Sequence, residues 1–298
     1  MFNGVGTALL TPFNEDFTID YTSYEKLLKY QIENEIDYLV VLGTTGEAPV
    51  ISFDEREKLI AFTQEKVNGK VKIVVGTGSN NPKNVIENNK LAEKYKVDGV
   101  LIVNPYYNKS SQKGLVEYYK YICENTQLPV ILYNVPGRTG MNVLPETVIA
   151  IADQNKNVVA VKEASGNISQ IAQLIASKPK DLQVISGNDD QTLPIMALGG
   201  VGVISVFSNI FPKEMKILVD AMLNNNFEKA REIHNRYLNM MNLLFVETSP
   251  SPAKYLASYM GLMKNILRMP LYPISKKSEE ILVAEYNKLK EMKWNMVL

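Results

Sequence analysis

The sequence predicts an α/β barrel, and three observations support this fold class. Eight short apolar runs rich in valine and isoleucine recur along the chain. Each run is continuous rather than alternating, which is typical of a parallel strand covered on both faces. Helical patterns separate the runs, and this repeated alternation indicates a (β/α)8 TIM barrel. The runs lie at residues 4–13, 38–47, 72–80, 99–108, 129–139, 158–166, 182–190 and 202–209.

The helical patterns between the runs have similar lengths, and one of them carries its own start signal. Residues 52–67 open with Ser52, and Glu55 follows three positions later, which is the pattern of a capping box. Residues 81–96 and 111–126 form comparable patterns. An open doubly wound sheet is the alternative fold. Its glycine fingerprint after a first strand is missing, which disfavours dinucleotide binding.

The barrel pattern ends near residue 223, and a helical segment follows it. We therefore divide the chain into a barrel of residues 1–223 and a C-terminal helical extension of residues 224–298. Helical patterns in the extension cover roughly 226–246, 251–261 and 276–292, with a proline-containing turn at 248–252. These patterns are amphipathic and rich in leucine, methionine and tyrosine, so we expect the extension to pack on the barrel.

The charge balance disfavours several classes of function. Lysines plus arginines number 32, acidic residues also number 32, and the formal net charge is zero. Nucleic-acid and membrane partners need a one-signed field, so we expect neither. No apolar run approaches the ~18 residues needed to cross a bilayer, and the N-terminus has no basic region of a signal peptide. The sequence therefore predicts a cytoplasmic protein.

Cysteine and histidine are scarce, which limits the chemistry. The chain has one cysteine, Cys123, and one histidine, His234. A zinc site needs several such ligands, so we expect no metal. A nucleophile activated by histidine could use only His234, which lies in a helical pattern without catalytic context. Proton transfers in an enzyme would then use tyrosine, lysine, carboxylates or water.

Polar side chains follow the apolar runs, where a barrel of this kind builds its active site. Lys162 ends one such run. Strict alternation predicts one face made of Val158, Ala160 and Lys162, and an opposite face made of Val159, Val161 and Glu163. A lysine inside the barrel is partly desolvated, which favours the neutral amine that forms Schiff bases with ketones. A structural ion pair at the barrel mouth is the alternative.

Other run ends supply groups that suit a small carboxylate substrate. Thr44 and Thr45 offer hydroxyls and backbone N–H groups on a glycine-flanked turn, which could also be a simple turn. Arg138 could bind a second carboxylate bidentately or lie on the surface. Tyr133 could transfer protons or only pack. Residues 188–190 (Asn-Asp-Asp) resemble metal ligands, but we favour capping of the helix that they begin.

Taken together, these motifs resemble the dihydrodipicolinate synthase family, the lysine-pathway group of the pyruvate-dependent class I lyases and aldolases. The resemblance covers nearly the whole chain, and the order and spacing of the motifs make it specific. It is carried by GTTGE (43–47), GTGSNN (76–81), PYYNK (105–109), YNVPGRTG (133–140), VKEASGN (161–167), SGNDD (186–190), GVISV (202–206) and LFVETSPSPAK (244–254).

The resemblance implies a reaction and places its substrates. Lys162 would form an imine with pyruvate. The pyruvate carboxylate would lie on Thr44 and Thr45, near the backbone of Gly187 and Ile204. The derived enamine would attack L-aspartate semialdehyde to give 4-hydroxy-tetrahydrodipicolinate, in lysine and diaminopimelate biosynthesis. Because the imine is the electron sink, no separate cofactor is implied.

The resemblance also implies roles that involve a second subunit. Tyr133 would shuttle protons through Thr45 to Tyr107, which in the family reaches in from a neighbouring subunit. The assembly implied is a homotetramer of two tight dimers. Arg138 would hold the semialdehyde carboxylate, and relatives that act on sialic-acid-like or keto-sugar-acid substrates usually lack this arginine. Such a relative remains one alternative. A barrel that only binds a ligand is another, against which the intact Lys162 and Tyr133 argue.

Four positions differ from the pattern of lysine-inhibited relatives. Ala48, Phe53, Arg56 and Asn84 stand where those relatives carry Ser, His, His and Glu. An added arginine and a missing carboxylate both disfavour a cationic effector. The sequence therefore predicts weak or absent feedback inhibition by lysine.

Overall fold

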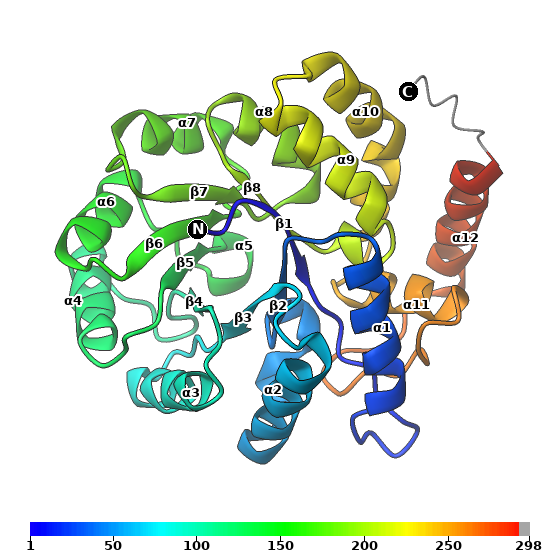
Figure 1. Cartoon of the computed structure of the whole chain (residues 1–298), viewed down its shortest axis with the longest axis horizontal. Helices are drawn as coiled ribbons and strands as arrows, with labels where there is room; N and C mark the ends of the chain where they lie inside the picture. The colour runs from blue at the N-terminus through cyan, green and yellow to red at the C-terminus, as the bar shows by residue number, and fades with distance from the viewer. Residues whose placement is uncertain (292–298) are drawn as a thin grey trace.

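The computed structural model describes residues 1–291, and its centre is a closed barrel of eight parallel strands. Each strand pairs with the next one along the chain, and β8 closes the barrel on β1 (Figure 1). The strands are β1 Gly4–Ala8, β2 Tyr38–Val41, β3 Lys72–Gly76, β4 Gly99–Val103, β5 Val130–Asn134, β6 Val158–Glu163, β7 Gln183–Ser186 and β8 Gly202–Ser205. Every strand lies within a predicted run, and the predicted barrel is confirmed.

Helices surround this barrel and alternate with its strands. They are α1 Tyr21–Glu33, α2 Phe53–Val67, α3 Pro82–Lys94, α4 Gln112–Cys123, α5 Pro136–Thr139, α6 Pro145–Gln154, α7 Ile168–Ser177, α8 Thr192–Ala197 and α9 Pro212–Leu223. Helix α2 begins as predicted. The Ser52 hydroxyl accepts the N–H of Glu55 at 3.3 Å, and the Glu55 carboxylate accepts the N–H of Ser52 at 2.9 Å. This capping box satisfies two N–H groups at the start of the helix.

The C-terminal segment forms three further helices on one side of the barrel. They are α10 Phe227–Leu243, α11 Ser251–Tyr259 and α12 Lys276–Glu291 (Figure 1). Helix α10 packs against α9, and α12 packs against α10 and α11. The turn before α11 contains Pro250, and Pro252 lies in the first turn of α11, where a missing N–H is tolerated. Residues 292–298 of the predicted extension lie outside the described residues.

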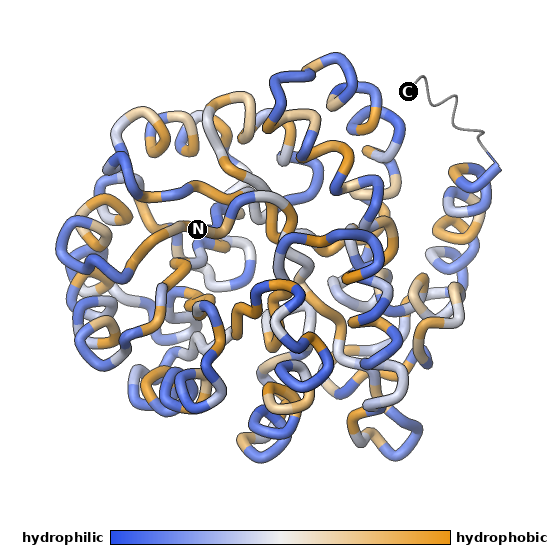
Figure 2. The backbone as a smooth tube through the Cα atoms, in the orientation of Figure 1, coloured by the Kyte–Doolittle hydropathy of each residue, from blue (hydrophilic) through white to orange (hydrophobic). Residues whose placement is uncertain are grey.

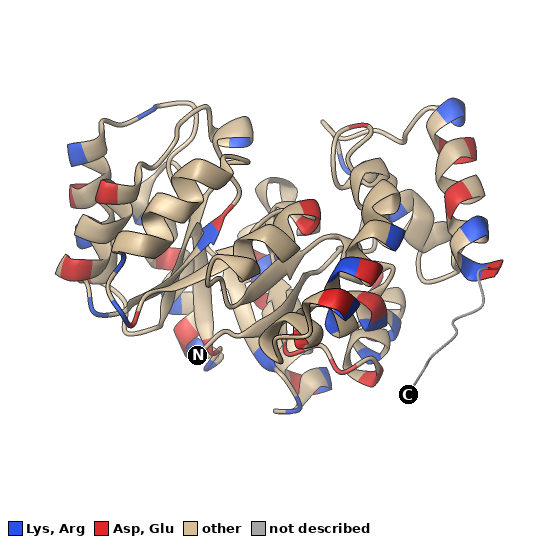
Figure 3. Cartoon of the chain, turned by 90° about the horizontal axis from the view of Figure 1, so that it is seen from above, with Lys and Arg blue, Asp and Glu red and all other residues tan. Residues whose placement is uncertain are grey.

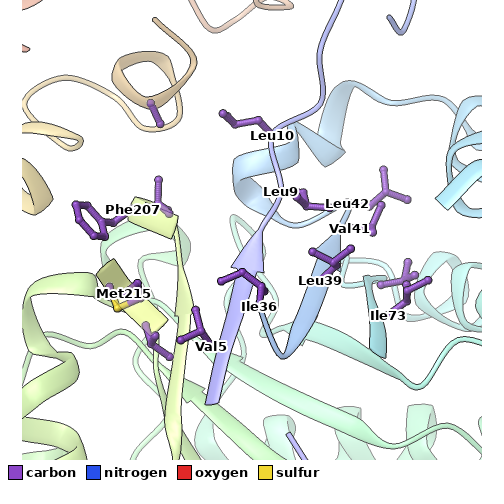
Figure 4. Close-up of a cluster of buried hydrophobic side chains, with 14 of the residues drawn as sticks. Val5, Leu9, Leu10, Ile36, Leu39, Val41, Leu42, Ile73, Phe207 and Met215 are labelled. Atoms are coloured by element: carbon purple, nitrogen blue, oxygen red, sulfur yellow. The ribbon is translucent and has the colours of Figure 1, made fainter. Parts of the chain in front are cut away.

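Two layers of apolar side chains lie on either side of the strand wall. The outer layer fills the space between strands and helices, and Figure 4 shows part of it, including Val5, Leu39, Val41, Ile73 and Phe207. The inner layer fills the barrel with Val40, Val74, Leu101, Ile131, Ala160 and Ile204. Because both strand faces are buried, apolar residues predominate in the strands, whereas apolar and polar residues alternate along the helices (Figure 2).

Residues of both charges are interspersed over the helices in the view of Figure 3. This mixing agrees with the formal net charge of zero. Within residues 1–291, no helix combines the length and the apolar character needed to cross a membrane.

Strand β6 departs from regular alternation near its start. Val130 pairs with Val158, but Ile131 pairs with Ala160, so Val159 is an extra residue in β6. Such a bulge shifts the facing of the residues before it. Val158 therefore belongs to the outer layer, and Ala160 to the inner layer. The prediction that Val158 shares a face with Ala160 and Lys162 is wrong.

Candidate active site

Lys162 lies inside the barrel at the C-terminal end of β6 and is only 5% exposed. Its register partner on β5 is Tyr133, which is 7% exposed. The Lys162 Nζ atom lies 4.3 Å from the centroid of the Tyr133 ring. The structure thus brings together the amine and the phenol that the sequence singled out separately.

The threonine turn follows β2 and is held tightly against the end of β1. It forms a short 3-10 helix, η1 Thr44–Gly46, in which Thr45 is 5% exposed. The Gly46 carbonyl accepts the Thr11 hydroxyl at 2.8 Å. A Cβ atom on Gly46 would lie 3.1 Å from the carbonyl oxygen of Leu9, so the close approach favours glycine. The two hydroxyls are therefore presented on a well-supported turn.

A cavity of about 650 Å³ lies at the C-terminal ends of strands β2 to β5 and is of a size suited to small-molecule ligands. Thr44, Tyr133 and Arg138 line it directly. Lys162 is buried against Tyr133, and Thr45 follows Thr44 in the same turn. The rest of the wall includes Leu42, Ala48, Phe53, Arg56, Gly76, Ser79, Asn84, Glu87, Leu101, Val103 and Tyr106.

Arg138 lies on the four-residue helix α5, where it is exposed and also lines this cavity. One guanidinium nitrogen, Nη2, donates to the carbonyl of Ser249 at 2.9 Å. That carbonyl belongs to the turn between α10 and α11, so the C-terminal segment orients the arginine. A guanidinium has five donors, and the donors left over can bind a carboxylate in the cavity.

Three predicted site residues do not line the cavity within one chain: Tyr107, Gly187 and Ile204. Tyr107 is 92% exposed and has a φ of 68°, so this chain does not bring it to Tyr133. The N–H of Gly187 already donates to the Glu163 carbonyl at 2.8 Å. Ile204 is fully buried in the inner layer. In the described part of the chain no hydrogen bond joins Tyr133 to Thr45, so the proton relay stays a prediction.

A buried polar network behind Lys162 holds β5 and β6 together. Asn134 and Glu163 are register partners, next in the chain to Tyr133 and Lys162. The Asn134 amide donates to both carboxylate oxygens of Glu163, at 3.2 and 3.1 Å. The N–H of Ser165 adds a bond of 2.7 Å, while burial raises the pKa of the Glu163 carboxyl. This network fixes the strand ends that carry the amine and the phenol.

Asp189 caps a different element from the one expected. It begins the short helix η3 Asp189–Gln191, and its carboxylate is buried. The Oδ2 atom accepts the N–H groups of Val206 at 3.1 Å and Phe207 at 2.9 Å. These groups lie at the start of η4 Phe207–Asn209, after β8. The prediction of capping within its own helix is wrong, because the buried N–H groups of the neighbouring corner need an acceptor.

Ionisation of the buried Asp189 carboxyl is expected to lower the free energy of unfolding as the pH rises. Burial raises the pKa of Asp189 from 3.8 to about 6. Between about pH 4 and pH 6 the folded protein keeps a proton that the unfolded chain has lost, so the unfolded state gains stability. A shift of about two units corresponds to about 3 kcal/mol.

The variant Asp189→Asn removes this titration and keeps an oxygen to accept the two N–H groups. We expect its stability relative to the parent to increase by about 3 kcal/mol from pH 4 to pH 6. Urea unfolding at several pH values measures the difference. Parallel pH dependences of the two proteins would contradict this assignment.

The remaining candidate groups lie away from the cavity. His234 is half-buried on α10, as expected for an ordinary packed histidine. Cys123 is buried at the end of α4, where burial raises the pKa of its thiol to about 12. Across residues 1–291, no three His, Cys, Asp or Glu side chains are grouped as potential metal ligands.

One feature near the threonine turn was missed by sequence reasoning. Glu47, the residue after the turn, forms a fully buried ion pair with Lys254 of α11. Both residues stand in the motifs that carry the family resemblance, at positions 43–47 and 244–254. Their presence in two distant motifs was the only available signal, because 207 positions separate them.

A buried lysine, a tyrosine, a threonine turn and an arginine lie beside one cavity at the C-terminal ends of the barrel strands. This arrangement is typical of an active site, and it identifies the protein as a barrel enzyme. The family model described as the Dihydrodipicolinate synthetase family matches residues 1–289. The chain belongs to this family, and the resemblance predicted from its motifs is confirmed.

Individual relatives agree over nearly the full length. The chain is 51% identical over 285 residues to the 4-hydroxy-tetrahydrodipicolinate synthase of Thermotoga neapolitana, covering 95% of this chain and 97% of that protein. The crystal structure of dihydrodipicolinate synthase from Thermotoga maritima matches with a TM-score of 0.96 at 48% identity, covering 97% and 99%. The chloride-inhibited enzyme of Acinetobacter baumannii complexed with pyruvate matches with a TM-score of 0.95 at 36% identity, also covering 97% and 99%.

Proposed function

We propose that this protein condenses pyruvate with L-aspartate semialdehyde to give 4-hydroxy-tetrahydrodipicolinate, in lysine and diaminopimelate biosynthesis. The observation that carries the proposal is the buried Lys162 amine against the Tyr133 ring, beside a cavity that Arg138 also lines. Relatives named for this synthase activity support the choice of substrates. The cytoplasm is the expected location.

The first step uses the lysine and the threonine turn. The Lys162 amine attacks the ketone carbon of pyruvate, and loss of water leaves an imine. The pyruvate carboxylate is held by the hydroxyls and N–H groups of Thr44 and Thr45, near the backbone of Gly187 and Ile204. Tyr133 donates the proton that the departing hydroxyl needs, since its ring already contacts the amine.

The second step forms the carbon–carbon bond. The imine withdraws electrons, so the pyruvate methyl group loses a proton and an enamine results. The enamine carbon attacks the aldehyde of L-aspartate semialdehyde, whose carboxylate binds Arg138. The amino group of that substrate then closes the ring on the imine carbon and releases Lys162. The imine is the only electron sink required, so the proposal includes no cofactor.

The proton path is proposed to cross a subunit boundary. Tyr107 is 92% exposed on a single chain, so its side chain is available to a second copy. We assign it to the active site of a neighbouring copy, where it completes the relay through Thr45 to Tyr133. The assembly proposed is a homotetramer of two tight dimers, which sedimentation at assay concentration would measure.

The test of the proposal is a two-substrate assay. Pyruvate loss is followed with L-aspartate semialdehyde present or absent, beside the variant Arg138→Ala. We expect loss only with both substrates, and in the variant a KM for the semialdehyde raised at least about tenfold, the effect of one charge-assisted contact. If the protein instead cleaves a sialic-acid-like or keto-sugar acid, the proposed acceptor is wrong.

Weak or absent inhibition by lysine is a second expectation for the same cavity. Ala48, Phe53, Arg56 and Asn84 all line it. The Arg56 guanidinium donates to the carbonyls of Ala48 and Ile51, so a positive charge is fixed in the wall. Half-inhibition by lysine below about 1 mM, an affinity worth about 4 kcal/mol, would refute this expectation. The Glu87 carboxylate in the same wall is the feature that could favour such binding.

A further inference from the structure

Two residues of the C-terminal segment contact Glu47, the residue that follows the threonine turn. Lys254 of α11 pairs with Glu47, and the side chains of both residues have no exposed surface. Glu47 directly follows the turn η1, and its N–H donates to the carbonyl of Thr44 at 3.1 Å. Its φ is 57°, in the left-handed region that costs a non-glycine residue energy. The ion pair therefore holds the residue that closes the turn.

Arg268 completes this arrangement from the segment between α11 and α12. Its backbone N–H donates to Oε2 of Glu47 at 3.0 Å, so both carboxylate oxygens have partners from the C-terminal segment. Its guanidinium donates to Val50 at 2.8 Å and to Phe17 at 2.6 Å, both backbone carbonyls. It also donates to Glu55 at 2.9 Å and holds the pKa of that carboxyl at about 2.

A buried ion pair is a costly way to attach one element to another. Desolvation offsets much of the attraction, and an apolar pair of the same volume is often equally stabilising. Burial lowers the pKa of Lys254 to about 8, even with Glu47 beside it. The charged pair fixes the orientation of the Glu47 carboxylate and of its left-handed backbone. Apolar contact alone would not fix this orientation.

We propose that Lys254 is a positioning residue for the carboxylate site at Thr44 and Thr45, acting through Glu47. This inference rests on the proposed function, in which the pyruvate carboxylate lies on that turn. The C-terminal segment is then part of the catalytic unit. Loosening the ion pair weakens pyruvate binding but leaves the chemistry at Lys162 intact.

The test uses a variant that removes both charges together. The double variant Glu47→Gln/Lys254→Met keeps both side-chain lengths and leaves no unpaired buried charge. The control is Lys264→Met, which breaks another ion pair between the C-terminal segment and the barrel, with Glu15 at 3.1 Å, where both side chains are exposed. Each protein is titrated with pyruvate in the presence of borohydride, and the reduced adduct is measured by mass. The KM and kcat values are measured in parallel.

We expect the half-saturating pyruvate concentration of the double variant, and its KM for pyruvate, to rise about tenfold, equivalent to about 1.4 kcal/mol. The extent of labelling at saturation, the kcat and the KM for the semialdehyde should stay within about twofold of the parent, and the control should match the parent throughout. A folded double variant with an unchanged half-saturation would overturn the inference. An equal loss of kcat and of labelling would also overturn it.

Failure of the proposed function is distinguishable from failure of this inference. If the parent itself forms no adduct with pyruvate, the proposed function fails, whatever the variants do. If the double variant is unfolded by circular dichroism, Glu47→Gln replaces it. Glutamine keeps the side-chain length but loses the charge that pairs with Lys254, so the half-saturation should rise about threefold. An unchanged value in a folded Glu47→Gln protein would overturn the inference equally.

Discussion

Replacing Lys162 with alanine is expected to lower kcat/KM more than about 1000-fold, because no other group can form the imine. The Nζ atom is the proposed nucleophile, and Lys162 lies at the end of β6 in register with Tyr133 of β5. Steady-state assays with both substrates measure the loss. Retention of more than about one tenth of the parent activity would contradict covalent catalysis by this residue.

The matched control for this variant is Lys162→Arg. Arginine places a positive charge near the Tyr133 ring but is not a nucleophile at neutral pH, since its guanidinium stays protonated. We expect it to be as inactive as the alanine variant. Activity in the arginine variant alone would show that a positive charge at position 162 suffices and that a nucleophile is not needed there. Thermal melting of both proteins establishes that the barrel, in which this side chain is 5% exposed, is still folded.

The variant Tyr133→Phe is expected to lower kcat about 100- to 1000-fold, within the range for loss of a general acid–base. Phenylalanine keeps the ring whose centroid lies 4.3 Å from Lys162 Nζ, so packing is preserved and only the hydroxyl is lost. The KM for pyruvate should change little. A kcat within about threefold of the parent would assign proton transfer to another group.

Tyr119→Phe is the matched control for the loss of a buried phenol. The Tyr119 hydroxyl donates to the Ile102 carbonyl at 2.9 Å and lies in the outer layer between α4 and the barrel. Its removal should cost about 1 kcal/mol of stability and leave kcat unchanged. The two variants thus separate a catalytic hydroxyl from a structural one.

The fold could be predicted because each strand is buried on both faces, which leaves a continuous apolar run in the sequence. The bulge in β6 could not be predicted from the same signal. Val158, Val159, Ala160 and Val161 are all apolar, so an extra residue in the ladder leaves no mark in the pattern. Only the pairing of β5 with β6 shows that Val158 faces the outer layer.

The candidate site was partly predictable for a related reason. Lys162, Tyr133, Thr44 and Arg138 are polar residues at the ends of apolar runs, and barrel closure brings such ends together. The supports of the site are long-range. Lys254 reaches Glu47 from a helix 207 positions away, and the Asp189 carboxylate serves N–H groups after β8. No local sequence pattern predicts these contacts, because the two partners lie far apart in the sequence and meet only in the folded structure.

Mass mapping after reduction locates the lysine that carries pyruvate, which we propose to be Lys162. The protein is incubated with pyruvate and borohydride, digested, and searched for the reduced pyruvate adduct. We expect one modified peptide, containing Lys162, and no such peptide when borohydride or pyruvate is left out. An unmodified Lys162 in protein that consumes pyruvate, or an adduct on a different lysine, would contradict this proposal.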